Sequence, residues 1–225
     1  AIGNGWVHPI DQNQAYVDYP YALGLIDTED KRKAQLIMDQ FVDAILSEEW
    51  DDANDLSNDL ENLVVTASSV DVDNVLFASD PTNQYITDMT GYLNSPATRA
   101  ALNVENHTWT FCATGPYNAL NSDEQKSVLH LIPHLIKNYK VMIYTGNMDM
   151  NCNVLGVEKY LSHMQWPDYS KFLKAPRNNW RSKDGDLAGY GKQYGNLTTV
   201  VVRNAGHEVP FYQPANAQDM IYRFI

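Results

Sequence analysis

An aspartate and a histidine, Asp149 and His207, each lie in a glycine-containing turn directly after a short apolar run. A histidine removes a proton from a hydroxyl nucleophile when a carboxylate accepts a hydrogen bond from its other ring nitrogen. That hydrogen bond holds the required tautomer and stabilises the imidazolium that forms. An acid followed later in the chain by a histidine, both after strands, therefore predicts the acid and base pair of a nucleophilic enzyme.

The remaining histidines and the two cysteines have no comparable context. Five histidines lie outside such turns and are interpreted as packed or surface residues: His8, His107, His130, His134 and His163. Two of them have the i, i+4 spacing of a zinc-binding helix, but the accompanying glutamate and a third ligand are missing. Cys112 and Cys152 have no metal-binding spacing and form no disulfide framework. The sequence therefore predicts neither a metal nor a cofactor.

Two buried strands are expected to position this pair. Residues 140–145 and 198–203 are short runs of apolar or β-branched residues that end in glycine-containing turns. Residues 1–5 indicate the end of a further strand. Strands that alternate with helices predict a parallel sheet with crossover helices, and hence an α/β fold. In such sheets catalytic groups collect at the carboxyl ends of the strands, where both turns lie.

Helical periodicity predicts helices over five segments: residues 28–47, 48–65, 95–102, 122–138 and 214–225. Thr28 and Ser95 are the expected N-caps of two of them, because each is followed by residues that suit a first turn. Pro133 predicts a kink or break near residues 130–132. Residues 66–82 mix β-branched residues with Asp, Asn and Pro and are expected to form a loop, with at most a short strand.

Composition and charge exclude several classes of protein. With 44% hydrophobic and 20% charged residues, the 225-residue chain is expected to bury a core. Its net charge of −12 argues against a nucleic-acid partner, because binding to phosphates depends on clustered Lys and Arg. No run approaches the length of a membrane span, and the first residues do not have the charged-then-apolar layout of a secretory signal.

Asn106 and Asn196 both fit the Asn-x-Ser/Thr pattern of N-glycosylation. Two such sites favour the secretory route, and the acidic composition suits an acidic compartment. We therefore expect a lysosomal, vacuolar or secreted protein.

Three segments are similar to those of a known family. Residues 144–156, YTGNMDMNCNVLG, closely resemble the aspartate motif of serine carboxypeptidases, including the cathepsin A type. Residues 204–210, NAGHEVP, resemble their histidine motif, and residues 1–5, AIGNG, resemble the strand after their nucleophile helix. The resemblance implies the C-terminal portion of an α/β-hydrolase fold. Residues 1–26 and 139–225 would form the core, and residues 27–138 a helical cap insertion with connecting helices.

The resemblance also implies roles for particular residues. Asp149 and His207 would be catalytic, and Glu208 would line the pocket for the leaving residue. Cys112 would be bridged to the N-terminal half, whereas Cys152 is expected to be an inert buried thiol. No serine lies in a Gly-x-Ser-x-Gly setting, so the nucleophile is expected upstream of these residues.

The sequence thus predicts a serine-type carboxypeptidase that removes C-terminal residues from peptides through an acyl-enzyme. The chain alone is expected to be inactive and to need the N-terminal half of its own protein. The resemblance to the family also implies a homodimer. Two alternatives stay open at this point: a serine carboxypeptidase-like acyltransferase or esterase, and a catalytically inactive binding or storage relative.

Overall fold

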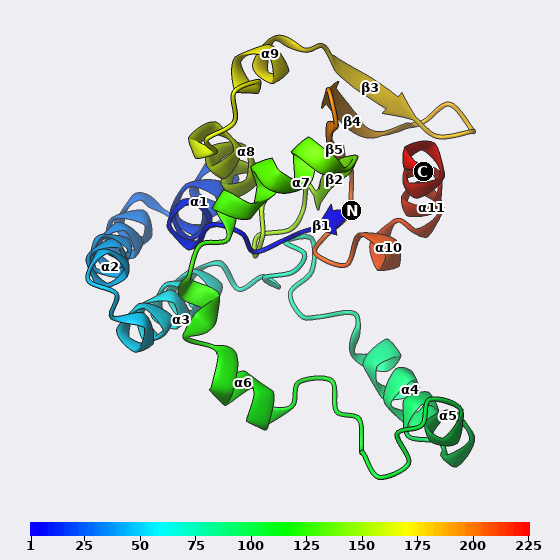
Figure 1. Cartoon of the computed structure of the whole chain (residues 1–225). Helices are drawn as coiled ribbons and strands as arrows, with labels where there is room; N and C mark the ends of the chain where they lie inside the picture. The colour runs from blue at the N-terminus through cyan, green and yellow to red at the C-terminus, as the bar shows by residue number, and fades with distance from the viewer.

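A mixed five-stranded sheet forms the centre of the structure, a computed structural model that describes residues 1–82 and 84–225 (Figure 1). The strands are β1 (Ile2–Gly3), β2 (Val141–Gly146), β3 (Arg177–Arg181), β4 (Leu187–Tyr194) and β5 (Leu197–Val202). Their order across the sheet is β1-β2-β5-β4-β3. The first three are parallel, whereas β4 runs antiparallel to both of its neighbours.

Both predicted buried strands are confirmed, as β2 and β5, and they lie next to each other. The prediction of a purely parallel sheet is wrong, because β3 and β4 add an antiparallel hairpin. β3 has the sequence RNNWR, is mostly exposed and lies at the edge of the sheet, so it lacks the apolar run of a central strand. β4 contains two glycines and polar residues, which weakened the strand pattern.

The two faces of the sheet are covered by different helices. Val141 and Ile143 of β2 pack in a core with residues of α7 (Ile132–Asn138) and α8 (Val154–His163). Met142 points to the opposite face and packs with residues of α11 (Pro214–Phe224). Alternate side chains of β2 therefore enter different cores, which is why its sequence is continuously apolar.

A further layer of helices packs on the side of the sheet that α7 and α8 cover. It consists of α1 (Pro9–Ala22), α2 (Thr28–Leu46) and α3 (Trp50–Ser68), which share one core. Met38 and Phe41 of α2 and Leu60 and Val64 of α3 are almost completely buried in it. The two predicted helices are confirmed, but Asp27 rather than Thr28 is the N-cap of α2, since its carboxylate accepts hydrogen bonds from the backbone N–H groups of Glu29 and Asp30.

The remaining helices are short: α4 (Asn83–Leu93), α5 (Pro96–Ala101), α6 (Thr114–Leu120), α9 (Tyr169–Lys174), α10 (Val209–Tyr212), and the 3₁₀ turns Asp123–Gln125 and Leu129–Leu131. Ser95 is confirmed as the N-cap of α5. The predicted helix over residues 122–138 breaks where expected, but only its last part, α7, is α-helical. Pro133 lies in the first turn of α7, where its missing N–H has no cost.

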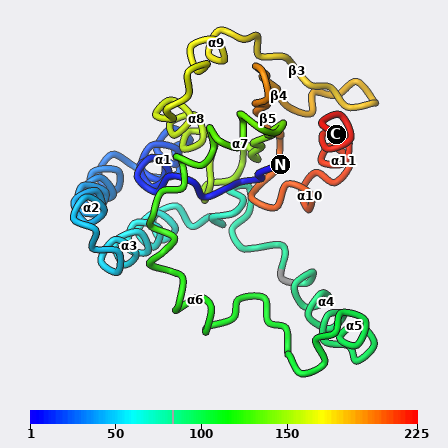
Figure 2. Tube along the Cα trace, viewed as in Figure 1, coloured from blue at the N-terminus to red at the C-terminus, as the bar shows by residue number. Residues whose placement is uncertain are grey.

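Of the loop predicted over residues 66–82, residues 66–68 belong instead to the end of α3. Residues 69–82 form a loop and pass close to the ends of the central strands before the chain continues to α4 (Figure 2). The N–H of Val75 donates to the carbonyl of Met148 at 3.0 Å, and the N–H of Met150 donates to the carbonyl of Val72 at 3.0 Å. The loop is therefore hydrogen-bonded to the turn that follows β2. Among the described residues, no helix has the length and apolar character needed to cross a membrane.

Candidate active site

The turns after β2 and β5 are hydrogen-bonded to each other. The N–H of Met148 donates to the carbonyl of Ala205 at 2.9 Å, and the N–H of Asn204 donates to the side-chain oxygen of Asn147 at 2.7 Å. Asn204 has a φ of 55°, a left-handed conformation that asparagine tolerates better than most residues. A Cβ atom on Gly146 would lie 2.3 Å from the carbonyl oxygens of Ala205 and Gly206, so this close approach requires glycine.

This approach brings Asp149 and His207 into contact. The Nδ1 atom of His207 lies 3.1 Å from Oδ2 of Asp149. The Asp149 side chain is fully buried, whereas 29% of the His207 side chain is exposed. The pair therefore has the geometry that the sequence predicts, with a buried carboxylate behind a histidine that reaches solvent.

Further donors hold the Asp149 carboxylate in one orientation. Asn4, which directly follows β1, donates from Nδ2 to Oδ2 at 2.5 Å. The backbone N–H of Cys152 donates to Oδ1 at 3.1 Å. Both carboxylate oxygens are thus engaged, and the carboxylate is positioned by three separate parts of the chain. Asn4 was missed in the sequence analysis, although it directly follows a strand that is parallel to β2 and β5.

The environment of His207 favours its charged form. Burial by itself lowers the pKa of the ring, but the hydrogen bond to Asp149 is the largest opposing effect, and the pKa of His207 is raised above its ordinary value. Burial raises the pKa of the Cys152 thiol, which is 3% exposed. The thiol is therefore neutral at physiological pH, and the carboxylate of Asp149 is the charge that stabilises the imidazolium.

A second carboxylate, Asp73, lies beside this pair. The backbone carbonyl of Asp73 accepts a hydrogen bond from the backbone N–H of His207 at 2.7 Å. The side chain of Asp73 accepts a hydrogen bond from the side chain of Asn151 at 3.2 Å. Ligand atoms of Asp73, Asp149 and His207 lie within 4.8 Å of one another. Burial raises the pKa of Asp73, and His207 partly offsets that effect. Asp73 comes from a loop without helical or strand periodicity, so nothing in the sequence pattern pointed to it.

The other residues singled out in the sequence are placed differently. Glu208 adjoins His207, its Oε2 atom is buried without a hydrogen-bond partner among the described residues, and burial raises its pKa. Cys112 is an exposed free cysteine in the described chain. Asn106 and Asn196 are exposed, and Asn196 donates to the carbonyl of Ile136 at 2.9 Å. Glu208 therefore lies beside the pair, whereas Cys112, Asn106 and Asn196 lie elsewhere in the structure.

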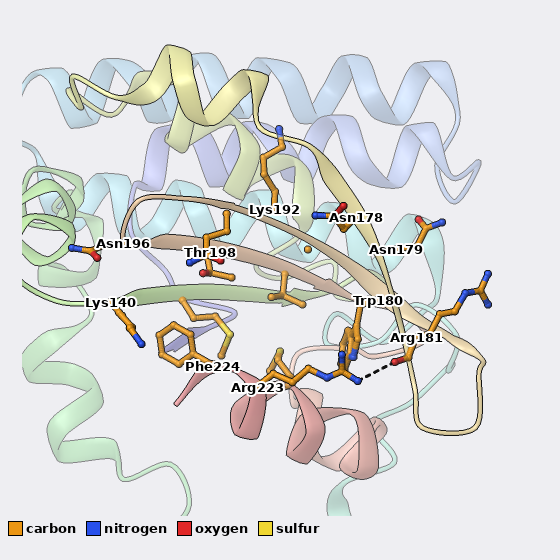
Figure 3. Close-up of a pocket in the computed structure, with 15 residues that line it drawn as sticks. Lys140, Asn178, Asn179, Trp180, Arg181, Lys192, Asn196, Thr198, Arg223 and Phe224 are labelled. Atoms are coloured by element: carbon orange, nitrogen blue, oxygen red, sulfur yellow. Dashed lines mark hydrogen bonds between the residues drawn. The ribbon is translucent and has the colours of Figure 1, made fainter.

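The cavity in Figure 3 lies at a different place. It has a volume of about 510 Å³ and lies between the sheet and α11, where Trp180, Arg223 and Phe224 line it. Its lining also includes Lys140 and Asn196, which directly precede β2 and β5. The Asp149 and His207 turns follow these strands, so the cavity and the pair lie toward opposite strand ends. Among the described residues, no serine hydroxyl is hydrogen-bonded to His207.

Comparison with known proteins identifies the family. The model of the serine carboxypeptidase family matches residues 1–225. A probable serine carboxypeptidase CPVL of Dictyostelium discoideum is 36% identical over the whole chain, which covers 46% of that protein. The venom serine carboxypeptidase of Apis mellifera is 35% identical over the whole chain, which covers 49% of it.

A solved structure has the same fold. The prohormone-processing carboxypeptidase Kex1(delta)p of Saccharomyces cerevisiae matches 99% of the chain with a TM-score of 0.80 and 22% identity, and the chain covers 53% of it. This likeness confirms the expected α/β-hydrolase fold, of which the chain forms a part. The chain spans about half the length of the curated relatives it matches, and it belongs to the serine carboxypeptidase family.

Proposed function

We propose that the protein carrying this chain is a serine-type carboxypeptidase that removes C-terminal residues from peptides. The observation that carries the proposal is the 3.1 Å contact between His207 and the buried Asp149 in a member of this family. The nucleophilic serine is supplied by a segment outside these 225 residues. The division into a core, residues 1–26 and 139–225, and a cap, residues 27–138, remains a prediction.

The pair takes part in both halves of the reaction. His207 accepts the serine proton while the serine oxygen attacks the carbonyl carbon of the last peptide bond. The proton then passes to the departing amine, the C–N bond breaks, and an acyl-enzyme remains. A water molecule then attacks the acyl-enzyme while His207 accepts its proton. This step releases the shortened peptide, and His207 returns the proton to the serine. Asp149 keeps the ring in the tautomer that accepts at Nε2 and stabilises the imidazolium.

Glu208 is proposed to line the pocket for the leaving residue. Its buried, unpartnered Oε2 atom supports this role, because a buried carboxylate oxygen without a partner is costly and a ligand group would satisfy it. A Glu208→Gln variant should therefore change KM between peptides with different terminal residues more than it changes kcat. An equal effect on all peptides would contradict the role.

A fluorophosphonate probe and a peptide-release assay over a range of pH test the proposed reaction, because His207 accepts a proton only in its neutral form and its pKa is raised above the ordinary value. The full-length protein should be labelled and should release C-terminal residues, whereas this chain alone should do neither. The substitution Asp149→Asn should reduce kcat by roughly 10⁴-fold, because it leaves His207 in the wrong tautomer. His134→Gln, at an exposed histidine on α7, is the matched control and should have no effect.

Three outcomes would overturn parts of the proposal. Labelling of the isolated chain would contradict a nucleophile outside it. Ester transfer without peptide cleavage would favour an acyltransferase or esterase. A full-length protein that is folded but neither labelled nor active would favour the binding or storage relative.

The protein is proposed to enter the secretory route, to carry glycans on the exposed Asn106 and Asn196, and to bridge the exposed Cys112 to its N-terminal half. One relative is named for venom, which supports the route. Enzymatic deglycosylation and non-reducing mass spectrometry test these features. An unshifted mass after deglycosylation or a free Cys112 thiol would contradict the corresponding feature. A homodimer remains a prediction, for sedimentation analysis to test.

A further inference from the structure

A second cluster of ionisable side chains lies between the start of α1 and the end of α8. It consists of His8, Asp11 and His163, whose ligand atoms lie within 4.8 Å of one another. His8 is the N-cap residue of α1, Asp11 lies in the first turn of α1, and His163 is the last residue of α8. The side chain of Asp11 is only 2% exposed, whereas that of His163 is 56% exposed.

Both imidazoles direct a nitrogen toward the same carboxylate oxygen. The Nδ1 atom of His163 lies 2.9 Å from Oδ2 and 3.0 Å from Oδ1 of Asp11, and the Nε2 atom of His8 lies 3.5 Å from Oδ2. In a tetrahedral zinc site with bonds of about 2.0–2.1 Å, neighbouring ligand atoms are separated by about 3.3 Å. The two distances to Oδ2 bracket that value, and the exposed His163 ring can adjust to complete the site.

The second nitrogen of His8 is held by a partner of its own. Nδ1 of His8 lies 2.7 Å from Oγ of Ser127. When that hydroxyl accepts a hydrogen bond from Nδ1, the lone pair of Nε2 faces Asp11. This arrangement is how proteins fix the tautomer and ring orientation of a metal-ligating histidine. A simple ion pair between His163 and Asp11 does not require His8 to be oriented in this way.

The backbone that carries the cluster is rigidly placed. The side chain of Gln12 accepts hydrogen bonds from the N–H groups of Val7 and His8, at 2.7 and 3.0 Å. Gly156 lets α8 approach α1, since a Cβ atom there would lie 3.1 Å from the Gln12 side chain. Ligands on two packed helices are held more precisely than ligands on loops.

The carboxylate of this cluster has no permanently charged partner among the described residues. Among the described residues, the ion-pair partners of the buried Asp11 are the two imidazoles, and no Lys or Arg pairs with it. A buried carboxylate is stable when it is paired or coordinates a metal.

We propose that His8, Asp11 and His163 bind a divalent transition-metal ion, Zn²⁺, with a water molecule in the fourth position. Two histidines, one carboxylate and an open position form a recognised zinc ligand set. The ion joins the start of α1 to the end of α8 and neutralises Asp11. The site is separate from the proposed peptidase reaction, so zinc binding and peptidase activity can fail independently of each other.

Zinc titration of the full-length, chelator-treated protein tests the proposal. Competition with a chromophoric chelator should show one Zn²⁺ per chain, and saturation at about 100 times the Kd should raise the Tm by about 3 °C for a protein about twice the length of this chain. Co²⁺ should give the visible absorption of a tetrahedral nitrogen and oxygen site. Both His163→Gln and His8→Gln should weaken zinc binding at least tenfold, and Asp11→Asn should do the same.

Two control variants separate this cluster from other histidines. His134→Gln removes an exposed histidine on α7 and should leave the zinc affinity unchanged. His207→Gln removes the other group of potential ligands, Asp73, Asp149 and His207, and should also leave it unchanged. Circular dichroism of each variant shows whether it is folded. The proposal is overturned if the folded protein binds no zinc, if folded His163→Gln and His8→Gln both keep the wild-type affinity, or if His207→Gln abolishes binding.

Discussion

Gly146 is the point at which the Asp149 and His207 turns touch, and its replacement by alanine tests whether this contact sets the geometry of the pair. A Cβ atom at this position would lie 2.3 Å from two backbone oxygens, those of Ala205 and Gly206. Ordinary carbon–oxygen contacts are about 3.3–3.6 Å, so the turn that carries His207 has to move by about 1 Å. Backbone atoms cannot rotate away as the end of a side chain can.

A movement of this size should open the hydrogen bond between His207 and Asp149. The bond is 3.1 Å long, and a further 1 Å takes it beyond hydrogen-bonding range. We expect Gly146→Ala to reduce kcat/KM of the full-length protein by about 10²-fold, as a misplacement of about 1 Å does in other active sites. The overpacking should also reduce the free energy of unfolding by about 1–3 kcal/mol.

Steady-state peptide release and urea unfolding measure the two effects, and Gly91 offers a matched control. Gly91 lies in α4 with no heavy atom within 4 Å of its added Cβ. Gly91→Ala should leave kcat/KM unchanged and should stabilise the protein by up to about 1 kcal/mol, since alanine is the better helix former. If folded Gly146→Ala has a kcat/KM within twofold of wild type, close contact at Gly146 does not position the pair, and the reasoning is refuted.

Four other perturbations test the site and the cores beneath it. Asn4→Ala removes a donor to Asp149 and should lower kcat/KM and reduce the unfolding free energy by about 1–3 kcal/mol, measured by kinetics and urea unfolding. Because folding raises the pKa of His207, its contribution to stability is complete below pH 6.5 and declines as pH rises through the folded-state pKa. The destabilisation by His207→Gln in urea should therefore be larger at pH 5 than at pH 9, and the opposite order would contradict the raised pKa. Cys152 should resist iodoacetamide in the folded protein and react in urea, as mapped by mass spectrometry; rapid labelling of native protein would show that the thiol is accessible. Phe41→Ala should reduce the unfolding free energy by about 3–5 kcal/mol, and a loss below 1 kcal/mol would mean that the helical core collapses around the cavity.

The parts of the fold that were predictable are those in which one strong local pattern decides the structure. β2 is buried on both faces, so its continuous apolar run identified it as a central strand. α2 and α3 each bury one stripe of apolar residues, including Phe41 and Leu60, and the helical period revealed both. The position of Asp149 after such a strand then followed, because strand ends point to a common edge of the sheet.

The parts that were missed depend on contacts between distant segments. α1 buries Asp11, Gln12 and Asn13 beside its apolar residues, so its buried face is partly polar and does not follow the usual amphipathic pattern. Some of these side chains have partners far along the chain: Asp11 pairs with His163 across 152 positions, and Asn13 accepts a hydrogen bond from Ser57 across 44 positions. A sequence pattern records which residues are apolar, but it does not record which polar groups become partners. The zinc ligand set was missed for the same reason.

Asp73 makes the loop over residues 69–82 a working part of the candidate site. Burial raises its pKa and His207 partly offsets the rise, so the protonation of Asp73 is set within the fold. When ionised, Asp73 places a second negative charge beside the imidazolium of His207 and stabilises it; when neutral, it does not. The base strength of His207 therefore increases as pH rises through the pKa of Asp73. A loop without periodic sequence thus tunes a pair whose members were both recognisable from the sequence.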